Sequence, residues 1–409
     1  MRREGSTFAP TPSKEKAVYD YCFYIGRFVN RPYGGNGNIP KTMYCKKIKL
    51  ENFRNVEGAE VSFSEGTNIL IGQNAQGKTN LLEAIFYASV GKSFRAAHSA
   101  EMIRFGADSA LIDLDSNDAT RDHNLKMRIF KDRQRRAERN GLKIEKMSEL
   151  VGGFRSVLFC PEHLSLIKDG PALRRNYLDI AISRLYPLYM KTLQRYNYIL
   201  KQRNALIKDA YTDRAAFDAT AEIWSMKLAR EAAIISKYRA EFLRRADVCV
   251  RDCFSDMTSE RERAELRYIS SSHAEVEECF DAAALEARYL DLFTSNCERE
   301  IAAGATLWGI HKDDIDIRLN SKQARVYASQ GQQRSLSLAL KIAEGDICAE
   351  EFGDYPVLLL DDVLSELDSE RRSYLTERLT DKQVIMTCCE SSIEGDMKLI
   401  RVEGGRYFE

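Results

Sequence analysis

The fold of this chain is decided by residues 69–79, which read Ile69-Leu70-Ile71-Gly72-Gln73-Asn74-Ala75-Gln76-Gly77-Lys78-Thr79. The three apolar residues predict a buried strand, and the apolar spacing of residues 80–89 predicts a helix. Residues 72–79 between them fit the pattern G-x-x-x-x-G-K-[ST]. In this pattern the glycines let backbone N–H groups point inward at phosphate oxygens, close to a helix N-terminus. The sequence therefore predicts a phosphate-binding loop within an α/β fold.

The residues of this loop have distinct predicted roles. Lys78 would neutralise the β and γ phosphates of ATP during catalysis, and the Thr79 hydroxyl would ligate Mg²⁺. ATP and Mg²⁺ are therefore the predicted cofactors. The predicted ATP-binding residues of the loop are Gly72, Gln73, Asn74, Ala75, Gln76, Gly77, Lys78 and Thr79.

A second part of the predicted site lies far along the sequence. The apolar strand Val357–Leu360 runs directly into Asp361 and Asp362. A buried parallel strand presents such acids at its carboxyl end, where α/β folds bind ligands. We expect Asp361 to hold Mg²⁺ and Asp362 to act catalytically by polarising the attacking water. Taken alone, the two acids are also consistent with a solvated loop, which is the less favoured interpretation.

A further helix start precedes these acids. Ser329, in Ser329-Gln330-Gly331-Gln332, is a candidate N-cap for a helix over about 330–350, whose first N–H groups would be free to donate. In isolation, the segment is also consistent with a capped amphipathic helix that binds nothing.

The chain divides into segments of different character. Residues 1–42 contain four prolines, a Gly/Asn-rich stretch and no periodicity, so we predict a disordered leader, with a start-site artefact as the alternative. Residues 43–160 and 300–409 show the α/β pattern and are predicted to form the head. Residues 161–299 are predicted to form a helical lobe with a short antiparallel arm. Helices of about twenty residues would give that arm a length of only ~30 Å.

Composition limits the compartment and the partners. The 409 residues include 61 basic and 61 acidic side chains, so nucleic-acid binding would need a local patch. The ten cysteines are scattered, without zinc-ligand spacing, and are interpreted as reduced thiols of a cytoplasmic protein. No apolar run is long enough to span a membrane, so no membrane partner is expected.

Two basic segments are candidates for binding DNA. Residues 170–210 hold eight basic and two acidic residues, interleaved with tyrosines. A second basic cluster spans 131–139, on a hairpin predicted from the turn residues Asn140-Gly141. Such patches predict salt-sensitive contacts to phosphates that do not depend on base sequence. The alternative is a solvated helical face. The candidate DNA-binding residues are Arg135, Arg136, Lys191, Arg195, Lys201 and Arg203.

Together these motifs resemble the ATP-binding-cassette ATPases. Residues 329–332 look like the signature motif of that family, and Asp368 matches its D-loop aspartate. The resemblance implies that the signature of one copy completes the ATP site of another, so that ATP joins two heads. It also implies ATP-binding roles for Ser329, Gly331, Gln332 and Asp368.

Shorter motifs, in the family's order from about Met43 to the C-terminus, are similar to those of the RecF family of bacterial DNA-repair proteins. The resemblance implies an ABC-type ATPase head with an inserted helical lobe. It implies a slow, DNA-stimulated ATPase whose ATP-bound homodimer clamps single-stranded, gapped or duplex DNA. It further implies RecO and RecR as partners and roles in recombinase loading, replication restart and the SOS response. The motifs are residues 50–55, 91–95, 159–162, 174–179 and 202–204.

The chain departs from that family at a few positions. Residues 309–314 correspond to a further motif of that family, in which Lys312 replaces an arginine and lacks its planar guanidinium group. His163 stands where an aspartate is common. His311 is open to two interpretations, a functional residue or a satisfied structural histidine. Two other functions stay open: a transporter ATPase subunit, and a nuclease with Asp314 and Asp316 as metal ligands. The absence of a switch histidine at Thr387 argues against the transporter.

Overall fold

The computed structural model describes residues 41–118, 120–146, 149–150, 152–364, 367–389 and 397–409. The predicted leader therefore lies outside the described residues, apart from its last two. These two form β1 (Lys41–Thr42), which pairs in parallel with β13 (Asp354–Tyr355). The end of the segment that we assigned to the leader is thus part of a sheet.

A six-stranded sheet carries the predicted phosphate loop. Its order is β17-β16-β4-β15-β14-β9, and all neighbours are parallel except β17, which is antiparallel to β16. Its central strands are apolar and buried, as expected for a sheet covered on both faces. The strands are β4 (Thr67–Ile71), β9 (Ser156–Phe159), β14 (Val357–Leu360), β15 (Val384–Cys388), β16 (Lys398–Glu403) and β17 (Arg406–Phe408).

A second six-stranded sheet is antiparallel, in the order β3-β2-β5-β6-β7-β8. The predicted turn at Asn140-Gly141 joins β7 to β8, and both residues have positive φ. The strands are β2 (Tyr44–Phe53), β3 (Val56–Ser62), β5 (Ser109–Asn117), β6 (Asp122–Phe130), β7 (Arg136–Arg139) and β8 (Leu142–Ile144).

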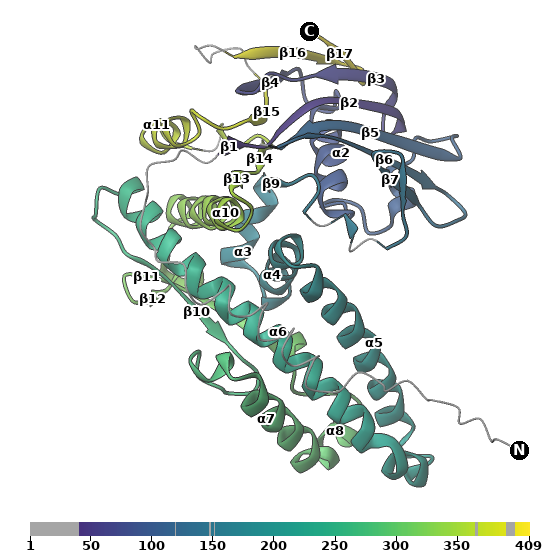
Figure 1. The fold of residues 1–409 in the computed structure, drawn as a ribbon. Helices are drawn as coiled ribbons and strands as arrows, with labels where there is room; N and C mark the ends of the chain where they lie inside the picture. The colour runs from purple at the N-terminus through teal and green to yellow at the C-terminus, as the bar shows by residue number, and fades with distance from the viewer. Residues whose placement is uncertain (1–40, 119, 147–148, 151, 365–366, 390–396) are drawn as a thin grey trace, which may run out of the picture. The chain divides into compact units, whose positions relative to one another are not determined.

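Helix α2 (Lys78–Val90) packs against strands of both sheets and joins them into one core (Figure 1). Its apolar side chains Leu81, Leu82 and Ile85 are fully buried in a cluster that also takes residues from β2, β5, β14 and β16. Because α2 begins at Lys78, this core fixes the helix end that follows the phosphate loop.

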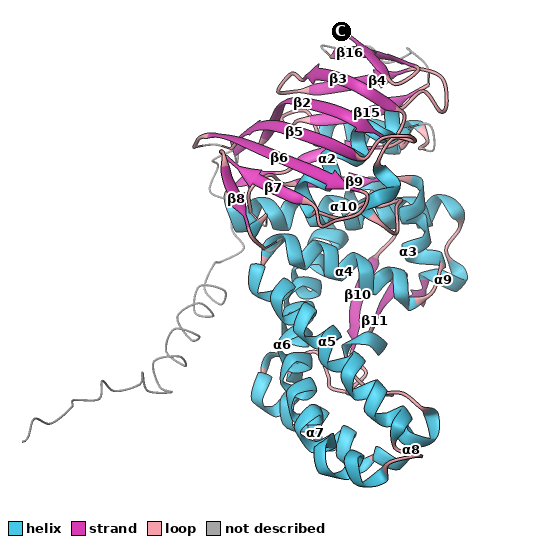
Figure 2. Cartoon of the chain, turned by 90° about the vertical axis from the view of Figure 1, so that its right-hand side faces the viewer, coloured by secondary structure: helices cyan, strands magenta, loops and turns pink. Residues whose placement is uncertain are grey.

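The middle of the chain is helical, and consecutive helices α5 and α6 run side by side (Figure 2). The prediction of helices of about twenty residues is wrong for α6, which has 44 residues. At 1.5 Å per residue it is about 66 Å long, because no Pro or Gly interrupts it between the Asp213 cap and Thr258. The helices are α3 (Ser165–Lys168), α4 (Pro171–Leu185), α5 (Pro187–Asp209), α6 (Arg214–Met257), α7 (Ala282–Ser295) and α8 (Cys297–Ala303).

The remaining elements connect the helical part to the parallel sheet. A small antiparallel sheet, β10-β11-β12, pairs β10 from the predicted lobe with β11 from the predicted head. Helix α10 packs against α6, and α11 follows β14. These elements are β10 (Ala264–Ile269), β11 (Asp314–Leu319), β12 (Lys322–Gln323), α9 (Ala324–Tyr327), α10 (Gln330–Phe352) and α11 (Ser369–Arg378). Short 3-10 turns are η1 (Ser99–Met102), η3 (Pro161–Leu164), η4 (Glu278–Phe280) and η5 (Ile310–Lys312).

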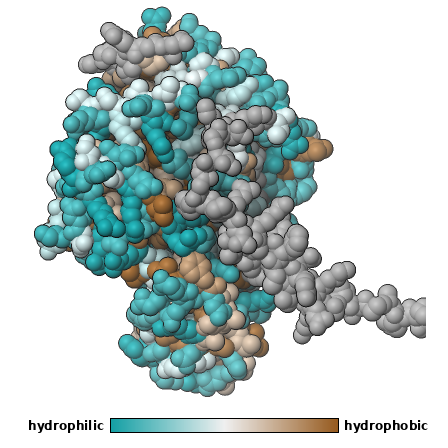
Figure 3. All heavy atoms as spheres, turned by 60° about the vertical axis from the view of Figure 1, so that its left-hand side comes forward, coloured by the Kyte–Doolittle hydropathy of each residue, from teal (hydrophilic) through white to brown (hydrophobic). Residues whose placement is uncertain are grey.

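Within the described part of the chain, no helix combines the length and the apolar character that a membrane span requires. Figure 3 shows one face of the molecule, on which hydrophilic side chains predominate and apolar ones gather in small areas. Among the described residues, one hydrophobic cluster of buried side chains lies around α2, and another lies where α5 ends and α6 begins.

Candidate nucleotide-binding site

The phosphate loop joins the end of β4 to the start of α2 in a conformation that needs both of its glycines. Gly77 has a φ of 114°, and a Cβ there would lie 3.0 Å from Asn55 Oδ1. A Cβ on Gly72 would lie 2.3 Å from the carbonyl oxygen of Val402. Ala75 also has a positive φ, of 65°. Glycine suits both positions, because it adopts a positive φ without strain and has no Cβ to clash with a close neighbour.

The turn between β16 and β17, together with Tyr407 of β17, donates hydrogen bonds to the phosphate loop. Gly404 N donates to Gln76 Oε1 at 2.6 Å, and Gly405 N donates to the Gln76 carbonyl at 2.9 Å. The Tyr407 hydroxyl donates to the Gly77 carbonyl at 3.0 Å. Sequence reasoning missed these contacts. The Gly404-Gly405 pair marks a turn, but nothing in the sequence places that turn beside residue 76.

The Lys78 ammonium group lies against the backbone of the phosphate loop, and the Thr79 hydroxyl faces Asp361. Lys78 is buried, and its Nζ donates to the carbonyl oxygens of Gly72 and of Gln73, the latter at 3.3 Å. The Thr79 hydroxyl donates to Asp361 Oδ1 at 2.9 Å. The P-loop and the acid that follows β14 are therefore in direct contact, although 282 positions separate them in the sequence.

Asp361 and Asp362 face different surroundings. Asp361 is buried, and its Oδ1 also accepts a hydrogen bond from the Thr387 hydroxyl at 2.9 Å. Burial raises the pKa of Asp361, and the hydrogen bonds from Thr387 and Thr79 oppose that rise. Asp362 is exposed, has a φ of 52°, and donates its backbone N–H to Thr387 at 2.8 Å. Thr387 therefore positions both acids, a role that its sequence position did not reveal.

The Thr79 hydroxyl and the Asp361 carboxylate fit a magnesium ion. Both are hard oxygen donors, which Mg²⁺ prefers, and they lie within hydrogen-bond distance of each other. They converge because β4, β15 and β14 are adjacent parallel strands, so their carboxyl ends meet at one edge of the sheet.

The signature segment, at the start of α10, and Asp368, at the start of α11, are linked to each other through Arg371. Ser329 caps α10 in a capping box with Gln332, as predicted, with Gln332 N donating to Ser329 Oγ at 3.3 Å. Asp368 caps α11 and pairs with Arg371, which also donates to Ser335 of α10. The bond to the Arg371 backbone N–H lowers the pKa of Asp368. Gly331 and Gln332 are half-buried in the first turn of α10.

A buried acid that the sequence analysis did not single out lies beside the loop. Glu83 of α2 is fully buried and accepts two hydrogen bonds from the Arg54 guanidinium, at 2.9 and 2.7 Å. It also accepts one from Ser93 at 2.5 Å, and Arg95 lies 3.9 Å away. The motifs at 50–55 and 91–95 therefore meet at one carboxylate.

The motifs at 174–179 and 309–314 also meet. Arg174 forms a bidentate ion pair with Asp314, at 2.6 and 2.9 Å. Asp313 is fully buried and pairs with Arg239 of α6 at 3.0 Å. Asp316 pairs with Arg318 at 2.7 Å. The two carboxylates of the nuclease alternative are thus each held by an arginine.

The three residues that the comparison with the family singled out are His311, His163 and Lys312. The two histidines are hydrogen-bonded within the protein. His311 uses both ring nitrogens, with Tyr196 Oη at 2.7 Å and the Thr306 carbonyl oxygen at 3.1 Å. Burial lowers the pKa of His311 to about 4. His163 Nδ1 accepts a hydrogen bond from Cys160 N at 3.1 Å, and burial lowers its pKa as well. Lys312 is exposed.

The structure separates the six candidate DNA-binding residues into two groups. It argues against Arg203, which is buried and paired with Glu300 at 2.6 Å. Arg135 is half-buried and donates to Tyr87 Oη and the Gly91 carbonyl, and Arg195 is already paired with Glu231. Basic side chains on a helix are buried when they are paired with an acid, and sequence alone does not show which face is covered. The exposed candidates are Arg136, Lys191, Arg195 and Lys201, and of these Arg195 is the one paired with Glu231.

Comparison with known proteins places this site in a family. The sequence model of the family described as RecF/RecN/SMC N terminal domain matches residues 44–403. The DNA replication and repair protein RecF of Clostridium novyi is 34% identical over 89% of this chain and 99% of its own length. The RecF of Clostridium acetobutylicum is 36% identical over 90% of this chain and 100% of its own. The chain belongs to the RecF family.

Solved structures agree with this membership. A RecF-ATP structure, described as that of a recombination mediator protein in the RecFOR pathway, has a TM-score of 0.85. It is 33% identical in sequence, covering 91% of this chain and 99% of the other. The Smc head domain of Pyrococcus furiosus shares the fold, with a TM-score of 0.52 at 16% identity. The predicted fold of a RecF-type ATPase head is thus confirmed, and RecF membership decides against a transporter subunit.

Proposed function

We propose that this RecF-family protein is an ATP-dependent DNA-binding protein of recombinational repair and replication restart. In this proposal, two copies close on single-stranded or gapped DNA when ATP is bound, and slow, DNA-stimulated hydrolysis releases them. The observation that carries the proposal is the cluster of Lys78, Thr79, Asp361, Asp362 and Thr387 at the carboxyl edge of the parallel sheet.

The chemistry of this cluster supports ATP as the substrate. The N-terminus of α2 and the Lys78 ammonium group offer positive charge to the β and γ phosphates. Mg²⁺, held by Thr79 and Asp361, would neutralise charge on the phosphates when bound. Asp362 is exposed beside this pair and is the candidate to orient the attacking water.

The signature segment supports a dimer as the active form. Within one chain, the capped start of α10 bonds to α11 and to Glu262, while the P-loop bonds to Asp361 and to the β16–β17 turn. We propose that Ser329, Gly331, Gln332 and Asp368 contact the ATP that a second copy holds. The first N–H groups of α10 would then donate to its phosphates.

DNA and protein partners complete the proposal. Arg136 of β7 and Lys191 and Lys201 of α5 are exposed cations that would contact backbone phosphates. RecO and RecR are the proposed protein partners, since the RecF-ATP structure is described as part of the RecFOR pathway. Support for recombinase loading and the SOS response would follow from action at gapped DNA.

The dimer is tested by measuring the molecular mass of the protein by light scattering, with and without Mg-ATP. We expect ATP to shift the wild type from monomer to dimer and to leave Lys78→Ala monomeric. Ser329→Arg is the matched variant: it keeps the P-loop intact, so it should bind ATP without dimerising. Dimerisation that ignores nucleotide and both substitutions would rule out the ATP-driven clamp.

A further inference from the structure

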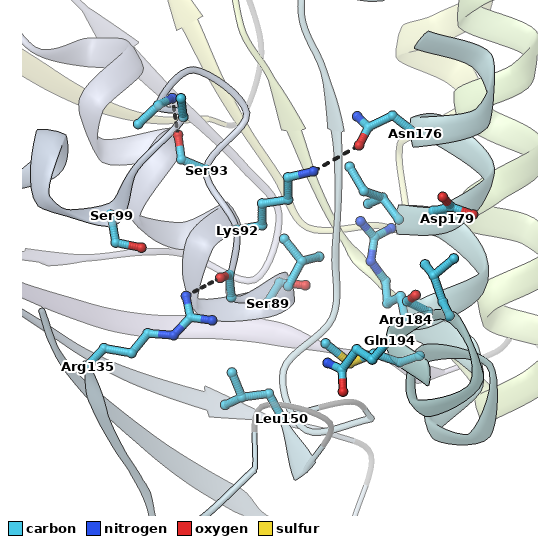
Figure 4. Close-up of a pocket in the computed structure, with 18 of the residues that line it drawn as sticks. Ser89, Lys92, Ser93, Ser99, Arg135, Leu150, Asn176, Asp179, Arg184 and Gln194 are labelled. Carbon is cyan, nitrogen blue, oxygen red and sulfur yellow. Dashed lines mark hydrogen bonds between the residues drawn. The ribbon is translucent and has the colours of Figure 1, made fainter. Parts of the chain in front are cut away.

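A cavity separate from the nucleotide site lies where the end of α2 and the segment just before β7 approach α4 and α5. Its volume is about 460 Å³, within the range of roughly 300–1,000 Å³ that is usual for small-molecule sites. One wall comes from the end of α2 and the segment after it, and the other from α4 and α5 (Figure 4). None of residues 72–79 lines it.

The charged side chains on its wall are mostly cationic. Lys92 and Arg135 come from one side and Arg184 from the other, against a single carboxylate, Asp179. That carboxylate already accepts hydrogen bonds from Tyr189 at 2.5 Å and from Arg239 at 2.8 Å. In a chain with no net charge, this wall is locally positive.

Arg184 is the decisive residue, because it is almost fully buried and only partly satisfied. One guanidinium nitrogen, Nη1, donates to Glu344, while Nε and Nη2 have no hydrogen-bond partner among the described residues and are themselves buried, so a ligand reaches them only when the Arg184 side chain shifts toward the cavity that it lines. Glu344 is also paired with the buried Lys341. Two buried cations therefore share one carboxylate, and the excess positive charge lies at the cavity wall. An unpaired buried donor is costly unless a ligand accepts from it.

The rest of the lining is suited to the organic part of such a ligand. Met102, Leu150 and Met190 provide apolar surface, and Gln194 and Asn197 provide amide donors and acceptors. Lys92 reaches across the cavity to Asn176, with Nζ 2.9 Å from Oδ1 (Figure 4). The Lys92 ammonium group is thus held where an incoming anion would meet it.

We propose that this cavity binds a nucleotide phosphate, with the phosphate at Arg184 and Lys92 and the ring portion against the apolar and amide side chains. The ligand is either a free mononucleotide or one nucleotide of a DNA strand, which share this chemistry. The proposal does not depend on ATP-driven dimerisation, and it assigns Arg135 to the lining of this cavity.

The probe is deoxyadenosine monophosphate, titrated into the full-length Lys78→Ala protein by calorimetry. The Lys78→Ala substitution weakens binding of the probe at the P-loop, so that the measured heat reports on the cavity. In this background, Lys92→Ala removes an exposed cation, and Arg184→Met leaves Glu344 paired with Lys341. Lys208→Ala is the matched control, because Lys208 is exposed on α5 and does not line the cavity. Circular dichroism checks that each variant is folded.

We expect Kd for the probe to rise roughly tenfold or more in Lys92→Ala and in Arg184→Met, and to stay unchanged in Lys208→Ala. Displacement of the probe by an oligonucleotide without terminal phosphates identifies a DNA strand as the source. Probe binding that resists the oligonucleotide identifies a free nucleotide. The proposal is overturned if no binding occurs up to millimolar probe, or if all three variants bind equally.

Discussion

Asp361 and Asp362 are neighbours in sequence, yet the backbone sends one into the protein and the other to the surface. Asp362 adopts a left-handed φ of 52°, which turns the chain immediately after a buried strand. Thr387 bonds to the carboxylate of the first acid and to the backbone N–H of the second. This single turn separates the proposed magnesium ligand from the proposed water-orienting group.

Asp362→Asn should bind Mg-ATP normally and hydrolyse it roughly 10²–10⁴-fold more slowly, because the amide is a poor base of nearly the same shape. Asparagine also tolerates a positive φ, so the turn should survive. Phosphate release and binding of a fluorescent ATP analogue would be measured together. Asp361→Asn is the comparison, and it should weaken the dependence of binding on Mg²⁺. A wild-type rate in Asp362→Asn would refute the assignment.

His311 predicts a pH dependence of stability. Its folded pKa of about 4 lies below the ordinary value of 6.5, because burial disfavours the charged ring. Between pH 6.5 and 4 the unfolded chain binds a proton that the folded protein does not. The free energy of unfolding should therefore fall as the pH is lowered through this window, by up to something on the order of 3 kcal/mol.

Urea unfolding of the wild type and of His311→Gln at pH 7, 6 and 5 would measure this effect. Glutamine can still bond to Tyr196 and to the Thr306 carbonyl but does not titrate, so its pH slope should be smaller. The buried His163 remains in both proteins, which makes the difference between the two slopes the informative quantity. Equal slopes would exclude the contribution of His311.

At the scale of elements, a buried cation of α6 adds polar contacts to the packing of this helix against its neighbours. Arg239 donates to Asp313, to Asp179 and to the Ile310 carbonyl, and it is 1% exposed. These bonds connect α6 with α4 and with the segment that precedes β11. Asp179 and Asp313, which lie in motifs of the family, therefore have a structural role as the partners of the buried Arg239.

Arg239→Met should lower the free energy of unfolding by roughly 3–5 kcal/mol, because two carboxylates lose their buried partner. Arg214→Met, at the exposed start of the same helix, removes a surface ion pair with Glu298 and should cost much less. Chemical denaturation of both variants would show the contrast. Similar losses in the two would mean that the buried network contributes no more than a surface pair.

At the scale of the whole molecule, a neutral chain must bind DNA through local charge. Lys191 and Lys201 form no hydrogen bond or ion pair within the part of the chain that the structure describes. Their ammonium groups are therefore free to meet phosphates, whereas Arg195 and Arg203 are already paired.

The double variant Lys191→Ala, Lys201→Ala should bind DNA more weakly and with a salt slope lower by about 2, since each lost phosphate contact releases about one counterion fewer. Fluorescence anisotropy with a gapped duplex over a range of salt concentrations measures both quantities. Arg288→Ala on α7 is the control, because its charge is paired with Glu278. An unchanged slope in the double variant would remove α5 from the DNA-binding surface.

The sequence by itself determined the parts of this protein whose physics is local. The P-loop, the strand before Asp361, the Ser329 cap and the turn at Asn140-Gly141 each follow from neighbouring residues, and the structure has them at those positions. Backbone geometry, capping and apolar spacing act over a few residues, so their signal can be read along the chain.

Only the tertiary structure decided what distant residues do to one another. It placed Thr387 between the two acids, bonded Gly404 to Gln76, and buried Arg203 while leaving Lys201 exposed. It also extended α6 to 44 residues and buried two donors of Arg184 for which the described part of the chain offers no hydrogen-bond partner. Burial and pairing depend on which surfaces the fold brings together, and a charged side chain has the same letter whether it faces solvent or a buried carboxylate.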